Sequence, residues 1–298
     1  MILVNMKILI TGALGQLGRA FTKEMQKDEV ELIRTSAGID GFGEGAIELD
    51  ITNLDNVLEV TKSTKPDVIV NCAAYTAVDQ QEKDVDLAYK INAIGPRNLA
   101  IAAQELSAKL VHVSTDYVFD GKGTRPYTEF DKPNPVSIYG KTKLAGEEFV
   151  KQFSSRSFIL RTAWLYGEGR NFLKTMLKLS ETHDEISVVD DQLGSPTSAA
   201  ELARAVRYIY KTDNYGLFHA TCEGSCAWAD FSEEIFRLTG KSTRVNRVSS
   251  RQYKEMNPDS ADRPAYSILD NYMFKLTSDY RFAGWKAALE EFLKGEAI

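Results

Sequence analysis

Runs of apolar residues alternate with segments of helical periodicity along the first half of the chain. Residues 7–11, KILIT, form the first run, and within 15–25 apolar residues recur at helical spacing: Leu17, Ala20, Phe21 and Met25. Further strands are predicted at residues 30–34, 46–50, 67–74, 109–114 and 157–162. Strands separated by helices are typical of parallel βαβ units. The predicted fold class is therefore α/β, a doubly wound, Rossmann-like parallel sheet.

The pattern becomes less regular after residue 162. Helices are predicted at 171–179, 199–210, 228–239 and 279–293, and strand candidates begin at residues 186 and 216. We expect a dinucleotide-binding domain over residues 1–165, to which elements from about 186–220 return. A smaller, interleaved substrate-binding lobe is expected over residues 166–298. The glycine-rich stretch 36–45 predicts a surface loop, and a helix is expected to begin at Thr52 or Asn53, which can cap free amides.

Composition and charge narrow the class of protein. The 298 residues are 43% hydrophobic and 26% charged, as in soluble globular proteins, and no apolar run approaches the ~18 residues of a membrane span. The net charge is −6 with no block of like charge, so nucleic acid is not expected as a partner. The first residues lack the pattern of a signal peptide, and we expect a cytoplasmic protein.

The three cysteines are Cys72, Cys222 and Cys226. His219 and the two later cysteines are candidates for a metal cluster, but the C-x-x-x-C spacing and the missing fourth ligand argue against one. We predict reduced, mostly structural thiols and no metal site.

Three glycines follow the first predicted strand as G-x-x-G-x-x-G: Gly12, Gly15 and Gly18. Without Cβ atoms they let backbone amides approach a pyrophosphate, and the N-terminus of the next helix adds partial positive charge. Such a turn can serve shape alone, but its place after the first strand favours a dinucleotide site.

The end of the second predicted strand leaves the choice of cofactor open. An acidic residue that would accept a ribose 2′-hydroxyl is absent, and Arg34 occupies this region. Arg34 has three open roles: stacking on adenine, binding a 2′-phosphate, or lying solvated at the end of a strand. The predicted cofactor is NADPH or NADH.

Tyr139 and Lys143 lie four positions apart in SIYGKTKLAGE, a predicted helix, and therefore share one helical face. An ordinary tyrosine titrates near pH ~10, but a nearby ammonium stabilises the phenolate and is expected to lower its pKa. Tyr139 would then be a usable acid or base. An isolated pair of this kind is more often an ordinary surface pair, so its context decides.

That context is the strand predicted at 109–114, which ends in Ser114, Thr115, Asp116 and Tyr117. Ligands bind at the carboxyl edge of a doubly wound sheet, where a hydroxyl can hold a carbonyl oxygen. Together, the glycine turn, the strand-end hydroxyl and Y-x-x-x-K resemble the extended, sugar-nucleotide-modifying branch of the short-chain dehydrogenase/reductase superfamily.

Nine stretches between residues 12 and 271 resemble the dTDP-4-dehydrorhamnose reductase family of that branch: GALGQLG, LDIT, NCAAYTAVD, STDYVFDG, YGKTKLAGE, RTAWLYG, NFLKTML, DQLGSPT and RPAYSILDN. The resemblance implies reduction of the C4 ketone of dTDP-4-dehydro-L-rhamnose to dTDP-L-rhamnose, with Thr115, Tyr139 and Lys143 as catalytic residues. Tyr139 would donate a proton to the C4 oxygen as nicotinamide delivers hydride to C4. Lys143 would also hold the nicotinamide ribose, and Thr115 would polarise the ketone.

The resemblance also implies a set of cofactor-binding residues: Gly12, Gly15, Gln16, Leu17, Arg34, Asp50, Ile51, Ala73, Ala74 and Tyr75, with Tyr139 and Lys143. Other roles are open for some of them, because Asp50 could cap the helix that follows and the two alanines could serve tight packing.

The implied substrate-binding residues are Thr115, Asp116, Tyr117, Trp164, Asn171, Gln192, Thr197 and Arg263. The guanidinium of Arg263 matches phosphate oxygens, although an arginine before a proline is equally suited to a salt bridge in a loop. Trp164 could belong to the core, and Asn171 could be a helix N-cap.

Two departures and two competing functions complete the interpretation. Cys72 stands where another small residue would serve, and the loop at 36–45 replaces an expected acidic lead-in, which leaves adenosine recognition open. Some relatives bind a divalent ion at a dimer contact; no residues for it can be located here, and a homodimer is an open expectation.

The competing functions are a non-catalytic regulatory subunit of the type associated with methionine adenosyltransferase, and a sugar-nucleotide epimerase or dehydratase. The intact catalytic set argues against the first, and STDYVFDG and DQLGSPT argue against the second.

Overall fold

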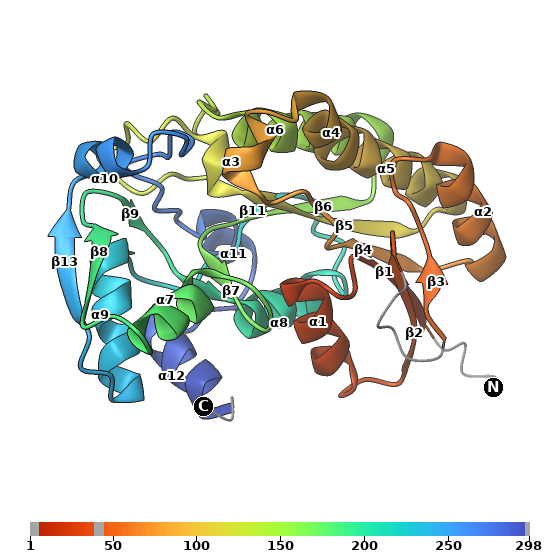
Figure 1. Ribbon diagram of the computed structural model, residues 1–298. Coiled ribbons are helices and arrows are strands. Elements are labelled where there is room, and N and C mark those ends of the chain that lie inside the picture. The colour runs from red at the N-terminus through yellow and green to blue at the C-terminus, as the bar shows by residue number, and fades with distance from the viewer. Residues whose placement is uncertain (1–5, 39–44, 296–298) are drawn as a thin grey trace.

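A parallel sheet of seven strands forms the centre of the computed structural model, which describes residues 6–38 and 45–295 (Figure 1). The strand order is β11-β6-β5-β4-β1-β2-β3. The bounds are β1 Met6–Thr11, β2 Val30–Ser36, β3 Ile47–Glu48, β4 Val68–Asn71, β5 Lys109–Thr115, β6 Ser157–Thr162 and β11 Gly216–His219. The chain reverses its direction of travel across the sheet between β1 and β4, so the ligand crevice is expected beyond the carboxyl ends of these strands.

Helices cover both faces of this sheet (Figure 1). One face carries α1 Gln16–Met25, α8 Ala199–Ile209 and α11 Tyr272–Thr277. The other carries α2 Leu54–Thr64, α5 Gly95–Leu106 and α6 Ile138–Phe153. The short elements α3 Val78–Gln81, α4 Val85–Tyr89 and the π-helical turn η1 Lys90–Ile94 lead into α5, and the 3₁₀ turn η2 Asp116–Val118 follows β5.

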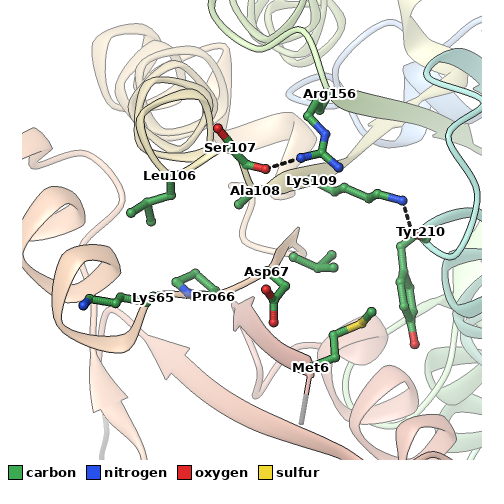
Figure 2. Close-up of a pocket in the computed structure, with 11 residues that line it drawn as sticks. Met6, Lys65, Pro66, Asp67, Leu106, Ser107, Ala108, Lys109, Arg156 and Tyr210 are labelled. Atoms are coloured by element: carbon green, nitrogen blue, oxygen red, sulfur yellow. Dashed lines mark hydrogen bonds between the residues drawn. The ribbon is translucent and has the colours of Figure 1, made fainter. Parts of the chain in front are cut away.

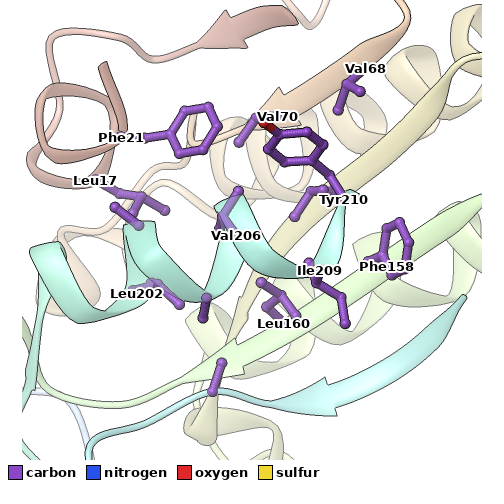
Figure 3. Close-up of a cluster of buried hydrophobic side chains, with 14 of the residues drawn as sticks. Leu17, Phe21, Val68, Val70, Phe158, Leu160, Leu202, Val206, Ile209 and Tyr210 are labelled. Carbon is purple, nitrogen blue, oxygen red and sulfur yellow. The ribbon is translucent and has the colours of Figure 1, made fainter. Parts of the chain in front are cut away.

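A buried apolar cluster holds α1 and α8 to the sheet (Figure 3). Leu17 and Phe21 of α1 meet Val206 of α8 over Val70 of β4. Phe21 is fully buried, and a side chain of this size contributes roughly 1.5–3 kcal/mol when removed from water. The i, i+4 spacing of Leu17 and Phe21 therefore explains why this segment is a helix and which face it buries.

A second lobe with its own apolar cluster lies beside the carboxyl edge of the sheet (Figure 1). Its elements are β7 Leu165–Tyr166, α7 Phe172–Ser180, β8 Glu185–Val189, β9 Leu193–Gly194, β10 Thr197–Ser198, β12 Cys226–Ala227, α9 Trp228–Thr239, β13 Arg244–Val248, α10 Ser250–Met256 and α12 Trp285–Gly295. Strand pairs β13-β8, β10-β7 and β12-β9 join segments that are distant in the sequence.

The predicted fold class is confirmed, and most elements begin within a few residues of their predicted positions. Asn53 caps α2, with its side chain accepting the amide of Asn56 at 3.2 Å. The strand predicted at 46–50 is only Ile47–Glu48, and the one at 67–74 ends at Asn71. Part of the predicted loop at 36–45 lies outside the described residues.

The helix predicted at 279–293 was placed too early, since α12 begins at Trp285. The preceding backbone is used for tertiary bonds instead: the amide of Ala283 donates to Glu201 Oε2 at 3.0 Å, and that of Trp285 donates to the carbonyl of Glu223. The predicted elements include no counterpart of β7, β12, β13, α10 and α11. No helix within residues 6–38 and 45–295 is both long enough and apolar enough to span a bilayer.

Candidate active site

The glycine turn follows β1 and runs into α1. Gly12 has φ +62°, and a Cβ there would lie 2.8 Å from the backbone of Ala73, just after the neighbouring strand β4. A Cβ on Gly18 would lie 2.4 Å from the carbonyl oxygen of Gly12. Gly15 is the N-cap of α1, and no described side chain caps this helix. The first amides of α1 are therefore left to an anion, as a pyrophosphate requires.

The end of β2 supports this turn. Ala13 donates its amide to the carbonyl of Thr35 at 3.0 Å, and the Thr35 hydroxyl donates to the carbonyl of Ile10 at 2.9 Å. Arg34 is half-buried on the same strand, one residue before this contact. Thr35 thus ties the second strand to the turn, and the position of Arg34 suits the predicted contact with the adenosine end of a cofactor.

Asp50 and Ile51 shape the loop after β3. Asp50 Oδ1 accepts the amide and the hydroxyl of Thr52 at 2.9 and 2.8 Å, so this carboxylate organises its own turn. Ile51 is buried against Gly95, and its carbonyl accepts Asn98 Nδ2 at 2.9 Å. The capping role left open for Asp50 is not observed, because Asn53 is the N-cap of α2. Contact of Asp50 and Ile51 with adenine stays a prediction.

The wall predicted along the dinucleotide corresponds to the segment after β4. Ala73, Ala74 and Tyr75 are half-buried, and the backbone of Tyr75 is fixed by Asn92, whose Oδ1 and Nδ2 bind its amide and carbonyl at 2.9 and 3.0 Å. Asn92 lies in the π-helical turn and also donates to the Thr142 hydroxyl at 3.2 Å. Asn92 thus links this segment to α6. It was not recognisable from the sequence, because a π turn has no simple periodic pattern.

Tyr139 and Lys143 both face β5 from α6. Lys143 is buried, with Nζ donating to the carbonyl of Val113 at 2.6 Å. Gly140 allows this close packing, since a Cβ there would lie 2.1 Å from the carbonyl oxygen of Tyr117. The rings of Tyr117 and Tyr139 meet edge to face, with centroids 5.3 Å apart. The shared helical face predicted for Tyr139 and Lys143 is present.

The prediction that Lys143 lowers the pKa of Tyr139 is wrong. Burial raises the pKa of Tyr139 to about 12, against the opposing hydrogen bond to Thr115. Burial also lowers the pKa of Lys143 to about 8, against the favourable field of Glu147. Helical spacing alone did not reveal that burial, and not the Lys143 ammonium, sets the direction of the shift for this phenol. The phenol therefore keeps its proton at neutral pH, which is the form that a proton donor needs.

Thr115 and Asp116 lie where β5 passes into η2. The Thr115 hydroxyl donates to Asp116 Oδ1 at 2.9 Å and accepts the amide of Tyr117 at 3.2 Å. Asp116 is buried, and within the described residues its Oδ2 has no hydrogen-bond partner. Burial raises the pKa of Asp116 to about 6, partly offset by the nearby hydroxyls of Ser267 and Thr115. The free oxygen is suited to accept a ligand hydroxyl.

Two of the predicted substrate residues approach this edge from the second half of the chain. Arg263 forms a 3.0 Å ion pair with Asp79, the loop salt bridge that the sequence left open, and its charge also acts on Tyr117. Trp164 has φ +48° and stacks on Trp228, with ring centroids 3.5 Å apart and planes 4° from parallel. A positive φ is strained for a bulky residue, so the surrounding packing fixes this indole in place.

The side chains of the other three predicted substrate-binding residues are fixed by hydrogen bonds. Gln192 Nε2 donates to the Ser250 hydroxyl at 2.9 Å. Thr197 is fully buried, donating to the carbonyl of Ser195 and accepting the amide of Cys222. Asn171 is the N-cap of α7, the alternative role left open from the sequence, and its side chain accepts the amide of Lys174 at 3.0 Å.

Buried polar residues behind the site were not singled out from the sequence. The Thr11 hydroxyl donates to Asn71 Oδ1 at 2.7 Å, and Asn71 Nδ2 lies 3.0 Å from His112 Nδ1. Burial, with the charge of Lys143, keeps the pKa of His112 well below its ordinary value. A signal was available, because Asn71 and His112 each interrupt an otherwise apolar strand.

A pocket of about 540 Å³ lies at the opposite, amino-terminal edge of the sheet (Figure 2). Met6, Asp67 and Lys109, at or near the first residues of three strands, contribute to its wall. None of the predicted site residues lines it, so it is separate from the candidate active site.

The family model described as RmlD substrate binding domain matches residues 6–298. The chain belongs to this family. A relative from Bacillus subtilis (strain 168), named Spore coat polysaccharide biosynthesis protein SpsK, is 39% identical over 97% of each chain. A solved dTDP-4-dehydrorhamnose reductase from Clostridium acetobutylicum ATCC 824 is 51% identical, with a TM-score of 0.90 over 97% of this chain and 99% of that one. Another from Bacillus anthracis str. Ames, in complex with NADP, is 42% identical, with a TM-score of 0.91 over 98% and 100%. These RmlD-family relatives confirm the resemblance to dTDP-4-dehydrorhamnose reductases.

Proposed function

We propose that this protein reduces the C4 ketone of dTDP-4-dehydro-L-rhamnose to dTDP-L-rhamnose with a nicotinamide cofactor. The observation that carries the proposal is that Thr115, Tyr139 and Lys143 come together between β5 and α6, at the sheet edge where the glycine turn opens. The solved reductases, at 51% and 42% identity, support the substrate class.

In the proposed reaction the cofactor supplies hydride to C4. Tyr139 donates its phenolic proton to the C4 oxygen, where negative charge develops, and Thr115 orients that oxygen by hydrogen bonding. Lys143, held at 2.6 Å by the carbonyl of Val113, has further N–H donors for a ribose hydroxyl and stabilises the phenolate that proton donation leaves.

NADPH or NADH is the proposed cofactor. The Bacillus anthracis relative contains NADP, and Arg34 at the end of β2 supplies a cation suited to a 2′-phosphate. The cradle of Gly12, Gly15 and Gly18 and the uncapped start of α1 fit the pyrophosphate. The other proposed cofactor residues are Gln16, Leu17, Asp50, Ile51, Ala73, Ala74 and Tyr75.

For substrate binding we propose Asp116 and Tyr117 at the sugar, with Trp164, Asn171, Gln192, Thr197 and Arg263 as further candidates. Thr197 is the weakest of these candidates, because its hydroxyl already donates to Ser195 and accepts from Cys222. It would act by positioning its neighbours. We divide the chain into a dinucleotide-binding domain over 1–165 and a mainly substrate-binding lobe over 166–298; the pairing of β11 with β6 supports the proposed return to the first domain.

We also propose a cytoplasmic protein that forms a homodimer. The three cysteines are free, as suits a reducing compartment, although Cys222 and Cys226 are both buried. Light scattering would test the dimer.

The test is an assay of purified protein with each reduced cofactor and dTDP-4-dehydro-L-rhamnose. We expect cofactor oxidation in step with formation of the alcohol, and none with the GDP- or UDP-linked ketosugar. Cofactor binding without turnover would favour a regulatory subunit, and a sugar product without net cofactor oxidation would favour an epimerase or dehydratase.

A further inference from the structure

Three consecutive residues of β5 each interact with one residue of α6. The carbonyl of Val113 accepts Lys143 Nζ at 2.6 Å, and the Ser114 hydroxyl donates to Glu147 Oε1 at 2.6 Å. The Thr115 side chain faces Tyr139 and acts on the pKa of its phenol. The helix residues are at positions i, i+4 and i+8 and so lie along one face. Glu147 therefore continues the row that contains the two proposed catalytic groups.

Glu147 is half of a buried ion pair. Arg161 of β6, which is directly opposite Ser114 in the sheet register, donates Nε and Nη2 to the two oxygens of Glu147 at 2.8 and 2.7 Å. The side chains of Arg161 and Glu147 are 1% and 0% exposed. The guanidinium also lies over the ring of Phe119, 5.2 Å from its centroid. Burying two charges is costly, so this pair is not explained by stability alone.

The groups around Lys143 leave Glu147 as its main source of negative charge. His112 of β5 is neutral, since burial and Lys143 itself keep its pKa low. Tyr139 of α6 keeps its proton at neutral pH. Asp116 of η2 acts on Tyr139, whereas among the described residues only Glu147 is found to oppose the effect of burial on Lys143.

The neighbouring η1 turn reaches α6 through Asn92 and the Thr142 hydroxyl, which are both uncharged. Arg161 of β6 directs Nε and Nη2 to the carboxylate of Glu147.

We propose that Glu147, fixed by Arg161 and Ser114, is a positioning residue that keeps Lys143 cationic and aligned with Tyr139. The kinetic consequence rests on the proposed function, but the charge state of Lys143 does not. Glu147 touches no reacting atom; it acts through the ammonium. Arg161 moderates the anion, so removing either partner breaks the same ion pair while changing the field at Lys143 in opposite directions.

The test follows the Lys143 ammonium by NMR of 13C-labelled lysine side chains, with the resonance assigned by Lys143→Arg. In the intact chain it should titrate near its pKa of about 8. Glu147→Gln removes the anion and should lower the midpoint by roughly one pH unit, the shift that one nearby charge produces. Arg161→Met leaves the anion unneutralised and should raise the midpoint. The alkaline limb of kcat/KM should move in the same two directions.

Both single variants lose stability, so a purely structural role would give them the same sign of effect or no shift at all. Either of those results would overturn the proposal. If a single variant does not fold, Glu147→Gln combined with Arg161→Met leaves no unpaired charge, and it should still lower the midpoint; an unchanged midpoint would contradict us. If the protein shows no reductase activity but the NMR midpoints shift as predicted, the proposed function fails while the role of Glu147 stands.

Discussion

Asn171 Nδ2 donates to Gln16 Oε1 at 3.0 Å, although the two residues are 155 positions apart. Gln16 is the first residue of α1, beside the glycine turn, and Asn171 is the N-cap of α7 in the second lobe. The same amide donates to the carbonyl of Gly167 at 2.7 Å, and a Cβ on Gly167 would lie 3.6 Å from Gln16 Cβ. The start of the substrate lobe is thus bonded directly to the proposed phosphate site.

Asn171→Ala should therefore weaken both stability and cofactor binding. Loss of the cap should cost about 1 kcal/mol of unfolding free energy. Loss of the bond to Gln16 should add about 0.5–1.5 kcal/mol. Urea unfolding and a fluorescence titration with NADPH would measure the two effects.

Gln16→Ala is the matched control, because it removes the bond between the lobes and leaves the α7 cap in place. The double variant should lose less than the sum of the singles. Strict additivity would show that the two side chains are not coupled.

Asp116 should make stability depend on pH. Its pKa of about 6 in the folded chain lies above the ordinary value of 3.8, so the folded chain holds a proton that the unfolded chain releases between these values. Stability should therefore fall as pH rises from 4 to 7, by up to about 3 kcal/mol at 1.36 kcal/mol per pH unit.

Asp116→Asn removes this titration and keeps a hydrogen-bonding side chain next to Thr115. The variant should gain stability relative to the natural chain as pH rises from 4 to 7, while losing turnover. Urea unfolding at several pH values measures the difference, and a difference that does not change with pH would refute the assignment.

Gly12→Ala should damage the fold and the cofactor site together. The added Cβ would lie 2.8 Å from the Ala73 backbone, at a φ of +62° that alanine rarely adopts. We expect a loss of roughly 1–3 kcal/mol and strongly reduced NADPH binding. Gly38→Ala is the control, because none of the described residues lies within 4 Å of a Cβ there, and it should change neither quantity.

The sequence predicted the parts of this protein that local patterns determine. Apolar runs located the strands, and helical spacing placed Tyr139 and Lys143 on one face. Contacts between distant segments could not be read in this way: the pairing of β13 with β8 joins segments nearly 60 residues apart. The ion pair of Glu147 and Arg161 likewise depends on how α6 lies over β6.

The pKa of Tyr139 shows a second limit. The spacing of residues predicted that Lys143 lies beside the Tyr139 phenol. How deeply the phenol is buried depends on the whole fold, and burial decides the direction in which its pKa shifts. The sequence indicated Asp116 as a candidate. That its Oδ2 lacks a hydrogen-bond partner within the described residues is seen only once β5, η2 and Ser267 are placed together.

The central claim is that Tyr139 donates the proton in ketone reduction. Turnover of dTDP-4-dehydro-L-rhamnose by Tyr139→Phe, with NADPH affinity measured in parallel, tests it most directly, and Tyr89→Phe on the exposed face of α4 is the control. We predict that kcat falls roughly 10²–10⁴-fold for Tyr139→Phe while NADPH affinity is retained, with the control unchanged. Turnover by Tyr139→Phe at the rate of the natural chain would contradict the account.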